Sequence, residues 1–239
     1  MQLPLKLIDP PQPALKDGVI GRNQAALMAL EQLCRQGTAG GSLVLWGAPG
    51  CGKSFWLEAW ATALAEQAIL IPAQNGVAPN AAGARIQALL DQADRQPLPR
   101  VWLIDNVDLA DSETAAALFR LYNAAREFGL QLVCTASAPP LRLQIRDDLR
   151  TRLGQSLIFE LLELDDDEKR TALRERAKRL GWPLSDELLG YLMTRLPRDL
   201  GLLTRVLDSL DQLALSRHRT ATVPLLKELL DSLDATHAL

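Results

Sequence analysis

The segment with the clearest chemical signature has the residue types and spacing that phosphate binding requires. It consists of Gly47, Ala48, Pro49, Gly50, Cys51, Gly52, Lys53 and Ser54. The glycines let the backbone curl until successive N–H groups face phosphates, while Lys53 can reach the β- and γ-phosphates and Ser54 can ligate Mg²⁺. A plain glycine-rich turn is the alternative, but it does not explain a Lys-Ser pair directly after the last glycine. The segment therefore predicts a nucleotide site that holds ATP or ADP with Mg²⁺.

A second candidate segment, Asp105 and Asn106, directly follows the apolar run 101–104. An acidic residue at the carboxyl end of that strand is where a phosphate-loop protein holds Mg²⁺, so Asp105 and Ser54 are the candidate metal ligands. A turn aspartate is the alternative, since Asp and Asn favour turns. Asn106 stands where fast ATPases place a carboxylate that orients the attacking water, and a neutral amide is a poor general base. We therefore expect slow or partner-dependent hydrolysis.

Two further segments carry candidate site residues whose sequence context leaves two interpretations open. The hydroxyls of Thr135 and Ser137 suit either an approach to the γ-phosphate and its attacking water or the closing of a strand before a turn. Arg152 suits an arginine finger that acts on a neighbouring subunit's nucleotide, because guanidinium matches phosphate bidentately. A solvated, exposed arginine is the alternative. Arg152 is nevertheless the candidate catalytic residue.

These residues must be positioned by short apolar strands that alternate with amphipathic helices. Apolar runs predict strands at 43–46, 68–71, 101–104, 130–135 and 157–161. Helical spacing predicts helices at 23–36, 53–67, within 81–94, at 112–128 and around 147–153, and then at 165–180, 185–195, 199–216 and 223–233. The fold class is therefore α/β, a mostly parallel sheet between helices followed by a smaller all-helical lid domain. The expected divisions are a tail and linker over 1–17, a nucleotide-binding domain over 18–164 and the lid over 165–239.

Composition is that of a compact protein. The 239 residues are 48% hydrophobic and 23% charged, and the net charge of -3 argues against a sequence-independent grip on nucleic acid. The three cysteines lie far apart without metal-ligand spacing, no N-terminal segment reads as a signal peptide, and charged residues interrupt every apolar run. We therefore expect a cytoplasmic protein with reduced thiols and no membrane contact.

Taken in order along the chain, these motifs resemble the AAA+ ATPases, and within them the DnaA/Hda family. The resemblance covers almost the whole sequence. It rests on residues 19–23, the phosphate loop, 103–106, 118–123, 135–140, 148–153 and the helical segment that ends near Leu233. The sequence stops where the initiator DnaA would add a helix-turn-helix DNA-binding domain. The resemblance is therefore to the Hda branch, whose members inactivate DnaA.

The amino-terminal residues Gln2, Leu3, Leu5 and Leu7 resemble the QLxLxL peptide by which bacterial proteins dock on the sliding clamp of DNA polymerase III, its β subunit. An extended peptide can insert alternate leucines into an apolar groove while Gln2 makes hydrogen bonds at the edge. A frayed terminus whose leucines pack on the domain is the alternative. Position at the extreme terminus, before the flexible stretch 9–13, favours docking.

The resemblance implies a regulator that sits on the DNA-loaded clamp, engages ATP-bound DnaA and stimulates hydrolysis of that ATP, which prevents re-initiation of replication. Arg152 matches the family's arginine-finger position. Contact with DNA is then only indirect, through the clamp, and the chain's own ATPase activity is weak or absent. The alternatives are an autonomous ATPase or helicase loader and a generic nucleotide-dependent adaptor.

Three features depart from the family or leave its assembly open. Gly201 occupies the second-sensor position, where relatives carry an arginine, and Arg198, one turn earlier, is either its substitute or a surface arginine. Ser137 and Ala138 stand where relatives often have an acidic-basic pair. Apolar stripes on the lid helices suit either a core or the contact of a homodimer. Both substitutions weaken the expected coupling between bound phosphate and conformation, and they favour a nucleotide-dependent scaffold over a motor.

Overall fold

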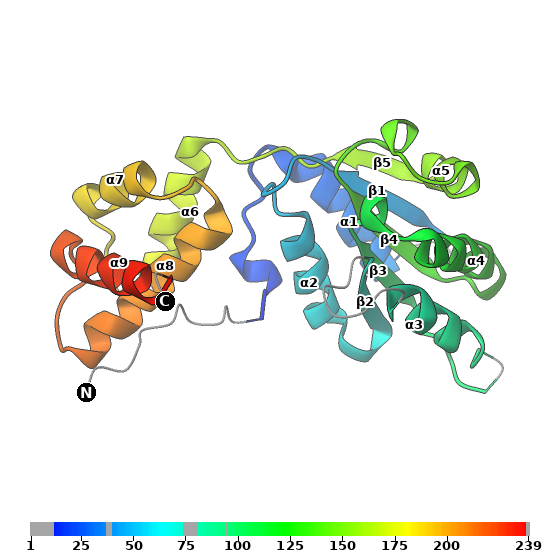
Figure 1. The fold of residues 1–239 in the computed structure, drawn as a ribbon, viewed down its shortest axis with the longest axis horizontal. Helices are drawn as coiled ribbons and strands as arrows, with labels where there is room; N and C mark the ends of the chain where they lie inside the picture. Colours follow the sequence, from blue (N-terminus) through cyan, green and yellow to red (C-terminus); the bar gives the residue numbers. More distant parts are fainter. Residues whose placement is uncertain (1–11, 37–39, 74–80, 94, 238–239) are drawn as a thin grey trace. The chain divides into compact units, whose positions relative to one another are not determined.

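The computed structural model describes residues 12–36, 40–73, 81–93 and 95–237, with side chains as far as Ser232. Within them the chain forms two compact units, Gln12–Glu163 and the residues from Leu164 onward. The first unit is α/β and the second is helical (Figure 1).

A five-stranded sheet organises the first unit. Its strands are β1 Ser42–Trp46, β2 Ala68–Pro72, β3 Val101–Asp105, β4 Gln131–Ala136 and β5 Leu157–Glu160. Their order is β2-β3-β4-β1-β5, and every neighbouring pair is parallel. All five carboxyl ends therefore lie along one edge of the sheet, where the loops that follow β1, β3 and β4 meet.

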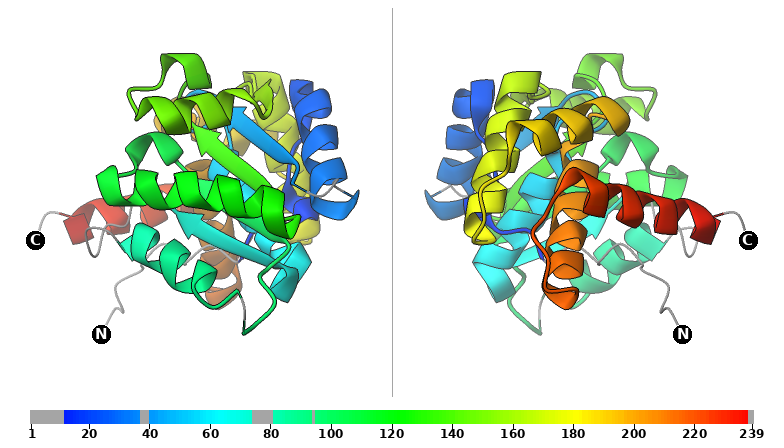
Figure 2. Two further views of the ribbon diagram at one scale, coloured as in Figure 1. Left: turned by 90° about the vertical axis from the view of Figure 1, so that its right-hand side faces the viewer. Right: turned by 90° about the vertical axis from the view of Figure 1, so that its left-hand side faces the viewer.

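Helices cover both faces of this sheet (Figures 1 and 2). One face packs against α3 Ala81–Leu90, α4 Ser112–Phe128 and α5 Asp147–Gly154, and the other against α1 Gln24–Gln36 and α2 Lys53–Leu64. Strand side chains alternate between the two cores: Trp102 and Ile104 enter the first, and Val101 and Leu103 the second. The parallel sheet between helices confirms the predicted fold class. Short 3-10 turns connect the elements at Leu15–Asp17, Gly21–Asn23, Ala65–Gln67, Val107–Leu109 and Pro140–Arg142.

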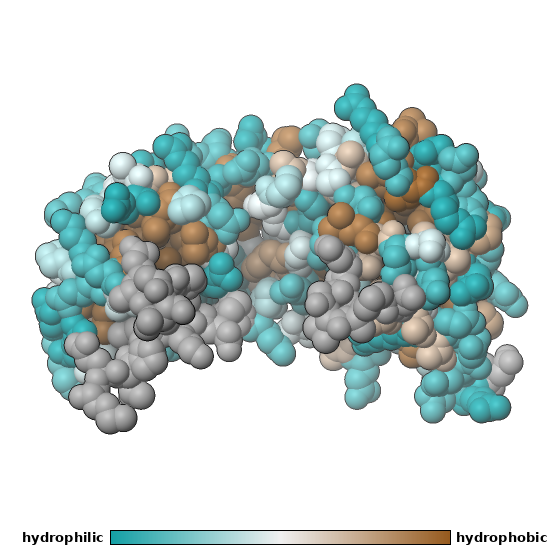
Figure 3. Space-filling view, viewed as in Figure 1, coloured by the Kyte–Doolittle hydropathy of each residue, from teal (hydrophilic) through white to brown (hydrophobic). Residues whose placement is uncertain are grey.

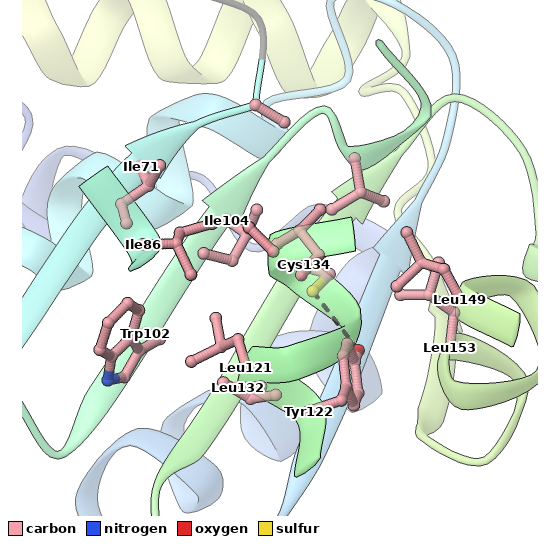
Figure 4. Packing of buried hydrophobic residues seen from close by; sticks show 14 of the residues in the cluster. Ile71, Ile86, Trp102, Ile104, Leu121, Tyr122, Leu132, Cys134, Leu149 and Leu153 are labelled. Atoms are coloured by element: carbon pink, nitrogen blue, oxygen red, sulfur yellow. Dashed lines mark hydrogen bonds between the residues drawn. The ribbon is translucent and has the colours of Figure 1, made fainter. Parts of the chain in front are cut away.

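The core beneath α4 excludes water from a polar contact between Tyr122 and Cys134. The Tyr122 hydroxyl lies 3.5 Å from Cys134 Sγ (Figure 4). Burial raises the pKa of the Cys134 thiol to about 12, and burial likewise raises that of Cys34 to about 12. Cys34, Cys51 and Cys134 are all free and buried, as expected for reduced thiols.

Two predicted helix ends differ from the structure. The helix expected over 53–67 ends at Leu64, because Ala65 takes a backbone conformation (φ 48°, ψ -122°) that no α-helix contains. A 3-10 turn then leads into β2. The last helix runs to His237, beyond the expected residue 233.

The second unit consists of α6 Asp166–Arg179, α7 Asp186–Arg195, α8 Leu200–Ser216 and α9 Val223–His237 around a leucine-rich core. Its first helix begins with a capping box, in which the Asp165 side chain accepts from the Glu168 backbone and the Glu168 side chain accepts from the Asp165 backbone. Asp208 on α8 accepts two hydrogen bonds from the Arg176 guanidinium, both at 2.9 Å. These contacts tie α6 to α8.

Hydrophilic side chains cover much of the face seen in Figure 3, with smaller apolar patches between them. Across the described ranges, none of the helices combines the length and the apolar character needed to span a bilayer.

Candidate functional site

The loop between β1 and α2 places the predicted phosphate-binding residues at the carboxyl edge of the sheet. Gly50 and Gly52 have φ values of 81° and 97°, a left-handed conformation that glycine adopts without steric cost. Gly52 is the residue before α2, so Lys53 and Ser54 are the first residues of that helix. The free N–H groups of a helix start favour an anion, so the local geometry suits a phosphate.

Gly47 is required at the start of this loop by a close backbone approach. A Cβ at this position would lie 2.3 Å from the Leu161 carbonyl oxygen and 2.9 Å from Cys51 Sγ. The Gly47 N–H also donates to the Ala136 carbonyl at the end of β4, over 3.2 Å. The loop is thereby fixed between β4 and the segment after β5.

Lys53 directs its ammonium into the loop. Its Nζ donates to the carbonyls of Gly47 at 2.7 Å and Ala48 at 2.9 Å, and the residue is only 8% exposed. A buried ammonium at the rim of a curled backbone is well placed to exchange carbonyl partners for phosphate oxygens.

Ser54 and Asp105, the two predicted metal ligands, are in direct contact although 51 positions separate them. Ser54 Oγ donates to Asp105 Oδ2 at 2.7 Å, and Thr135 Oγ1 donates to Asp105 Oδ1 at 2.5 Å. No group of three or more His, Cys, Asp or Glu side chains among the described residues is arranged to hold a metal ion. The pair nevertheless fits Mg²⁺, which is usually bound by one or two side chains together with phosphate oxygens and water.

Asn106 is held in a left-handed conformation (φ 57°, ψ 54°) directly after β3. Its side-chain amide donates to Asp105 Oδ2 at 3.1 Å, and its backbone N–H donates to Thr135 Oγ1 at 2.8 Å. The amide therefore supports the Asp105 carboxylate, and it cannot accept a proton as a carboxylate would.

Ser137, predicted to approach the nucleotide, donates to a residue that sequence reasoning missed. Its hydroxyl lies 2.5 Å from Asp108 Oδ2 and its backbone N–H 3.3 Å from the same oxygen. Asp108 belongs to the 3-10 turn after β3. Asp108 lies three residues after Asp105, and this closeness in sequence could have indicated that it belongs to the same site. The strand end that Asp108 faces, however, depends on the order of the strands in the sheet.

Arg152, the candidate catalytic residue, lies on α5 and is half-buried, so it is not the fully solvated arginine of the alternative interpretation. Its guanidinium donates to Asn123 Oδ1 at 2.9 Å and stands over the Phe119 ring, 5.7 Å from the centroid. Both partners lie on α4, four residues apart and therefore on one side of that helix. Sequence reasoning missed the positioning roles of Asn123 and Phe119.

Arg152 differs from the neighbouring arginines in the partners of its guanidinium. Arg146 pairs with Asp148 and Arg150 pairs with Asp147. The Arg146 guanidinium beside Asp148 lowers the pKa of that exposed carboxyl. Within the described residues, Arg152 has only neutral partners, so its positive charge remains uncompensated.

The remaining predicted site residues are not brought to the loop. Arg198 forms an ion pair with Asp166, and both residues belong to the second unit. Gly201 lies in the first turn of α8. Gln2, Leu3, Leu5 and Leu7 fall outside the described residues.

Glu58, one turn after Ser54 on α2, provides a pH-dependent prediction. Glu58 is an exposed residue, but partial desolvation of its carboxyl and then the negative charge of Asp105 raise the pKa of Glu58 above its ordinary value of 4.5. The ionised form is therefore disfavoured by folding, and the stability that this residue contributes falls as the pH rises above the unfolded pKa. Glu58→Gln is expected to raise the thermal midpoint at pH 7, with the gain disappearing below about pH 4, where the carboxyl is protonated in both states. Calorimetry across this range, with Glu66→Gln in the turn after α2 as control, checks it; an equal gain at all pH values would contradict it.

Comparison with known families and structures agrees with this geometry. Residues 43–161 match the family described as ATPases associated with various cellular activities, and residues 166–230 match the lid domain of Hda. Domain III of the replication initiation protein DnaA from Thermotoga maritima is 17% identical, with 93% of this chain and 98% of that chain covered and a TM-score of 0.71. AMPPCP-bound DnaA from Aquifex aeolicus is 18% identical, with 86% and 66% covered and a TM-score of 0.65.

The Holliday junction branch migration motor RuvB of Thermotoga maritima also shares the fold, at 16% identity and a TM-score of 0.65, with 92% of this chain and 71% of that chain covered. At these identities the solved structures report the fold alone. The family matches and the loop geometry together indicate a nucleotide-binding domain.

Proposed function

We propose that this chain, in which residues 43–161 match the AAA family of ATPases and residues 166–230 match the lid domain of Hda, is a regulatory inactivator of DnaA. In this proposal it binds ATP or ADP with Mg²⁺, docks on the DNA-loaded sliding clamp and stimulates hydrolysis of the ATP bound to DnaA. Re-initiation of replication is thereby prevented. DNA is contacted only through the clamp.

The observation that carries this proposal is the uncompensated guanidinium of Arg152. The neighbouring Arg146 and Arg150 are paired with carboxylates, whereas Arg152 is held by an amide and an aromatic ring. Neutral partners fix the direction of the side chain without cancelling its charge. Such an arginine suits the stabilisation of negative charge that develops on a partner's γ-phosphate during transfer.

The proposed site also favours weak turnover of the chain's own nucleotide. Lys53, Ser54 and Asp105 are placed to hold phosphates and Mg²⁺, but Asn106 offers an amide that already donates to Asp105. Without a carboxylate at that position, activation of water is poor. Nucleotide is then a structural ligand here, and hydrolysis takes place on DnaA.

Clamp docking is proposed from the amino-terminal residues Gln2, Leu3, Leu5 and Leu7. Its contribution is effective concentration, because a clamp that holds both DNA and this chain brings the chain close to DnaA on the same DNA. At low protein concentration, this increase in effective concentration decides whether the chain and DnaA form a complex.

The proposal is tested by following hydrolysis of ATP bound to DnaA in the presence of clamp-loaded DNA. The full chain is expected to accelerate hydrolysis, and deletion of residues 2–7 to reduce the effect at least tenfold at nanomolar protein while retaining it at high concentration. Lys6→Ala, a change inside the same peptide at a position that the pattern does not use, is the matched control. A pull-down with purified clamp should lose binding with the deletion and keep it with Lys6→Ala. Stimulation that is undiminished by the deletion would rule out the docking role, and no stimulation by the full chain would rule out the function.

A further inference from the structure

Two hydroxyls at the end of β4 each donate to a carboxylate that follows β3. Thr135 donates to Asp105 and Ser137 to Asp108, both over 2.5 Å. The two donors are two positions apart: Thr135 belongs to β4, and Ser137 is the first residue after that strand. The Gly47 N–H binds the carbonyl of Ala136, the residue between them. Ser137 is therefore adjacent to the first residue of the phosphate loop.

We propose that Asp108 is a specificity-determining residue of the nucleotide site, because it holds the Ser137 proton and thereby weakens binding of a nucleoside triphosphate relative to a diphosphate. This inference rests on the nucleotide binding proposed above. A hydroxyl has one proton to donate, and a terminal phosphate oxygen needs a donor. Ser137 has to leave Asp108 before it can donate to that phosphate.

The surroundings of Asp108 resist this exchange. Its Oδ1 is inaccessible to solvent and has no hydrogen-bond partner among the described residues. The Ser137 hydroxyl and backbone N–H both serve the other oxygen. The contact with Ser137 is exposed, so water can replace the hydroxyl at Oδ2, but the charge-assisted hydrogen bond between Ser137 and the carboxylate is lost. Its negative charge also opposes the additional charge of a terminal phosphate. A diphosphate has no terminal phosphate at that position, so its binding neither breaks the hydrogen bond between Ser137 and Asp108 nor adds the charge that Asp108 repels.

The two contributions can be separated by which partner is changed. Asp108→Ala frees the hydroxyl and removes the charge, whereas Asp108→Asn removes the charge but keeps an oxygen that accepts from Ser137. Ser137→Ala removes the donor for which Asp108 and the terminal phosphate compete. If the preference for a diphosphate arises because Asp108 holds the Ser137 proton, Asp108→Ala will change this preference only when the Ser137 hydroxyl is present.

Isothermal titration of the full chain with Mg²⁺ and either ADP or the β,γ-methylene analogue of ATP measures the preference directly. Asp108→Ala is expected to shift the ratio of the two dissociation constants about tenfold toward the triphosphate analogue, and Asp108→Asn in the same direction by a smaller factor. In the Ser137→Ala background the shift from Asp108→Ala should fall below about threefold. Asp91→Ala is the matched control, since Asp91 also accepts from a neutral side chain, Gln87, and should leave the ratio unchanged.

An unchanged ratio in Asp108→Ala would overturn the inference, and so would an equal shift with and without the Ser137 hydroxyl. In both cases nucleotide binding would persist and the proposed function would stand. A chain that bound neither nucleotide would overturn the inference together with nucleotide binding. If Asp108→Ala melts early, Asp108→Asn, which holds the hydroxyl less strongly than a carboxylate does, is compared with and without the Ser137 hydroxyl, and its shift should likewise fall in the Ser137→Ala background.

Discussion

Replacing Arg152 by alanine is expected to lower the stimulated hydrolysis of DnaA-bound ATP on the order of 1000-fold, the lower range for loss of an arginine finger. The physical reason is that the guanidinium is the uncompensated charge of α5, held by Asn123 and Phe119. Charge that develops on the transferring phosphoryl group would lose its stabilising partner. Single-turnover hydrolysis on clamp-loaded DNA measures the loss.

The matched control for this change is Arg150→Ala, two positions earlier on the same helix. Arg150 already pairs with Asp147, so its removal should change the rate less than threefold. Asn123→Ala should reduce the rate about tenfold while the apparent affinity for DnaA stays unchanged. The variant removes the hydrogen bond that orients the Arg152 guanidinium, but the positive charge of Arg152 remains. If Arg152→Ala still stimulates hydrolysis like the unaltered chain, the trans-acting arginine is excluded.

Replacing Lys53 by alanine is expected to weaken binding of ADP and ATP on the order of 100-fold. Hydrogen bonds from a charged donor contribute about 1.5–3 kcal/mol each. The ammonium lies inside the loop, 2.7 Å from the Gly47 carbonyl oxygen and 2.9 Å from that of Ala48. Its loss removes the positive charge from the place where phosphates are expected. Calorimetric titration with each nucleotide measures the effect.

Loss of binding by Lys53→Ala has to be separated from loss of folding, because Lys53 is only 8% exposed. Lys53→Met keeps most of the apolar stem and removes the charge, so it should bind as weakly as the alanine variant while melting closer to the unaltered chain. Lys178→Ala, an exposed lysine of α6, should leave the affinity unchanged. Unimpaired binding by both Lys53 variants would contradict the phosphate-loop assignment.

Local chemistry was sufficient to predict the elements and the phosphate loop. Apolar runs of strand length located all five strands. The central strands β1, β3 and β4 are buried between two helical layers and have to be apolar on both faces. The helix expected over 165–180 is α6, and its start depends on a local capping box that joins residues three positions apart. The early end of α2 was not predicted, since nothing in the type of Ala65 signals its positive φ.

The contacts that make a site were decided by the sheet order. Ser54 meets Asp105 across 51 positions because β1 and β3 both flank β4 and end at one edge. Asp108 meets Ser137, and Arg152 meets Asn123, each across 29 positions. Side-chain periodicity reports which face a residue takes on its own element, but not which neighbour that face will meet. Residue types therefore indicated the chemistry of phosphate binding, while the packing of strands and helices selected the partners that direct each hydroxyl, carboxylate and guanidinium.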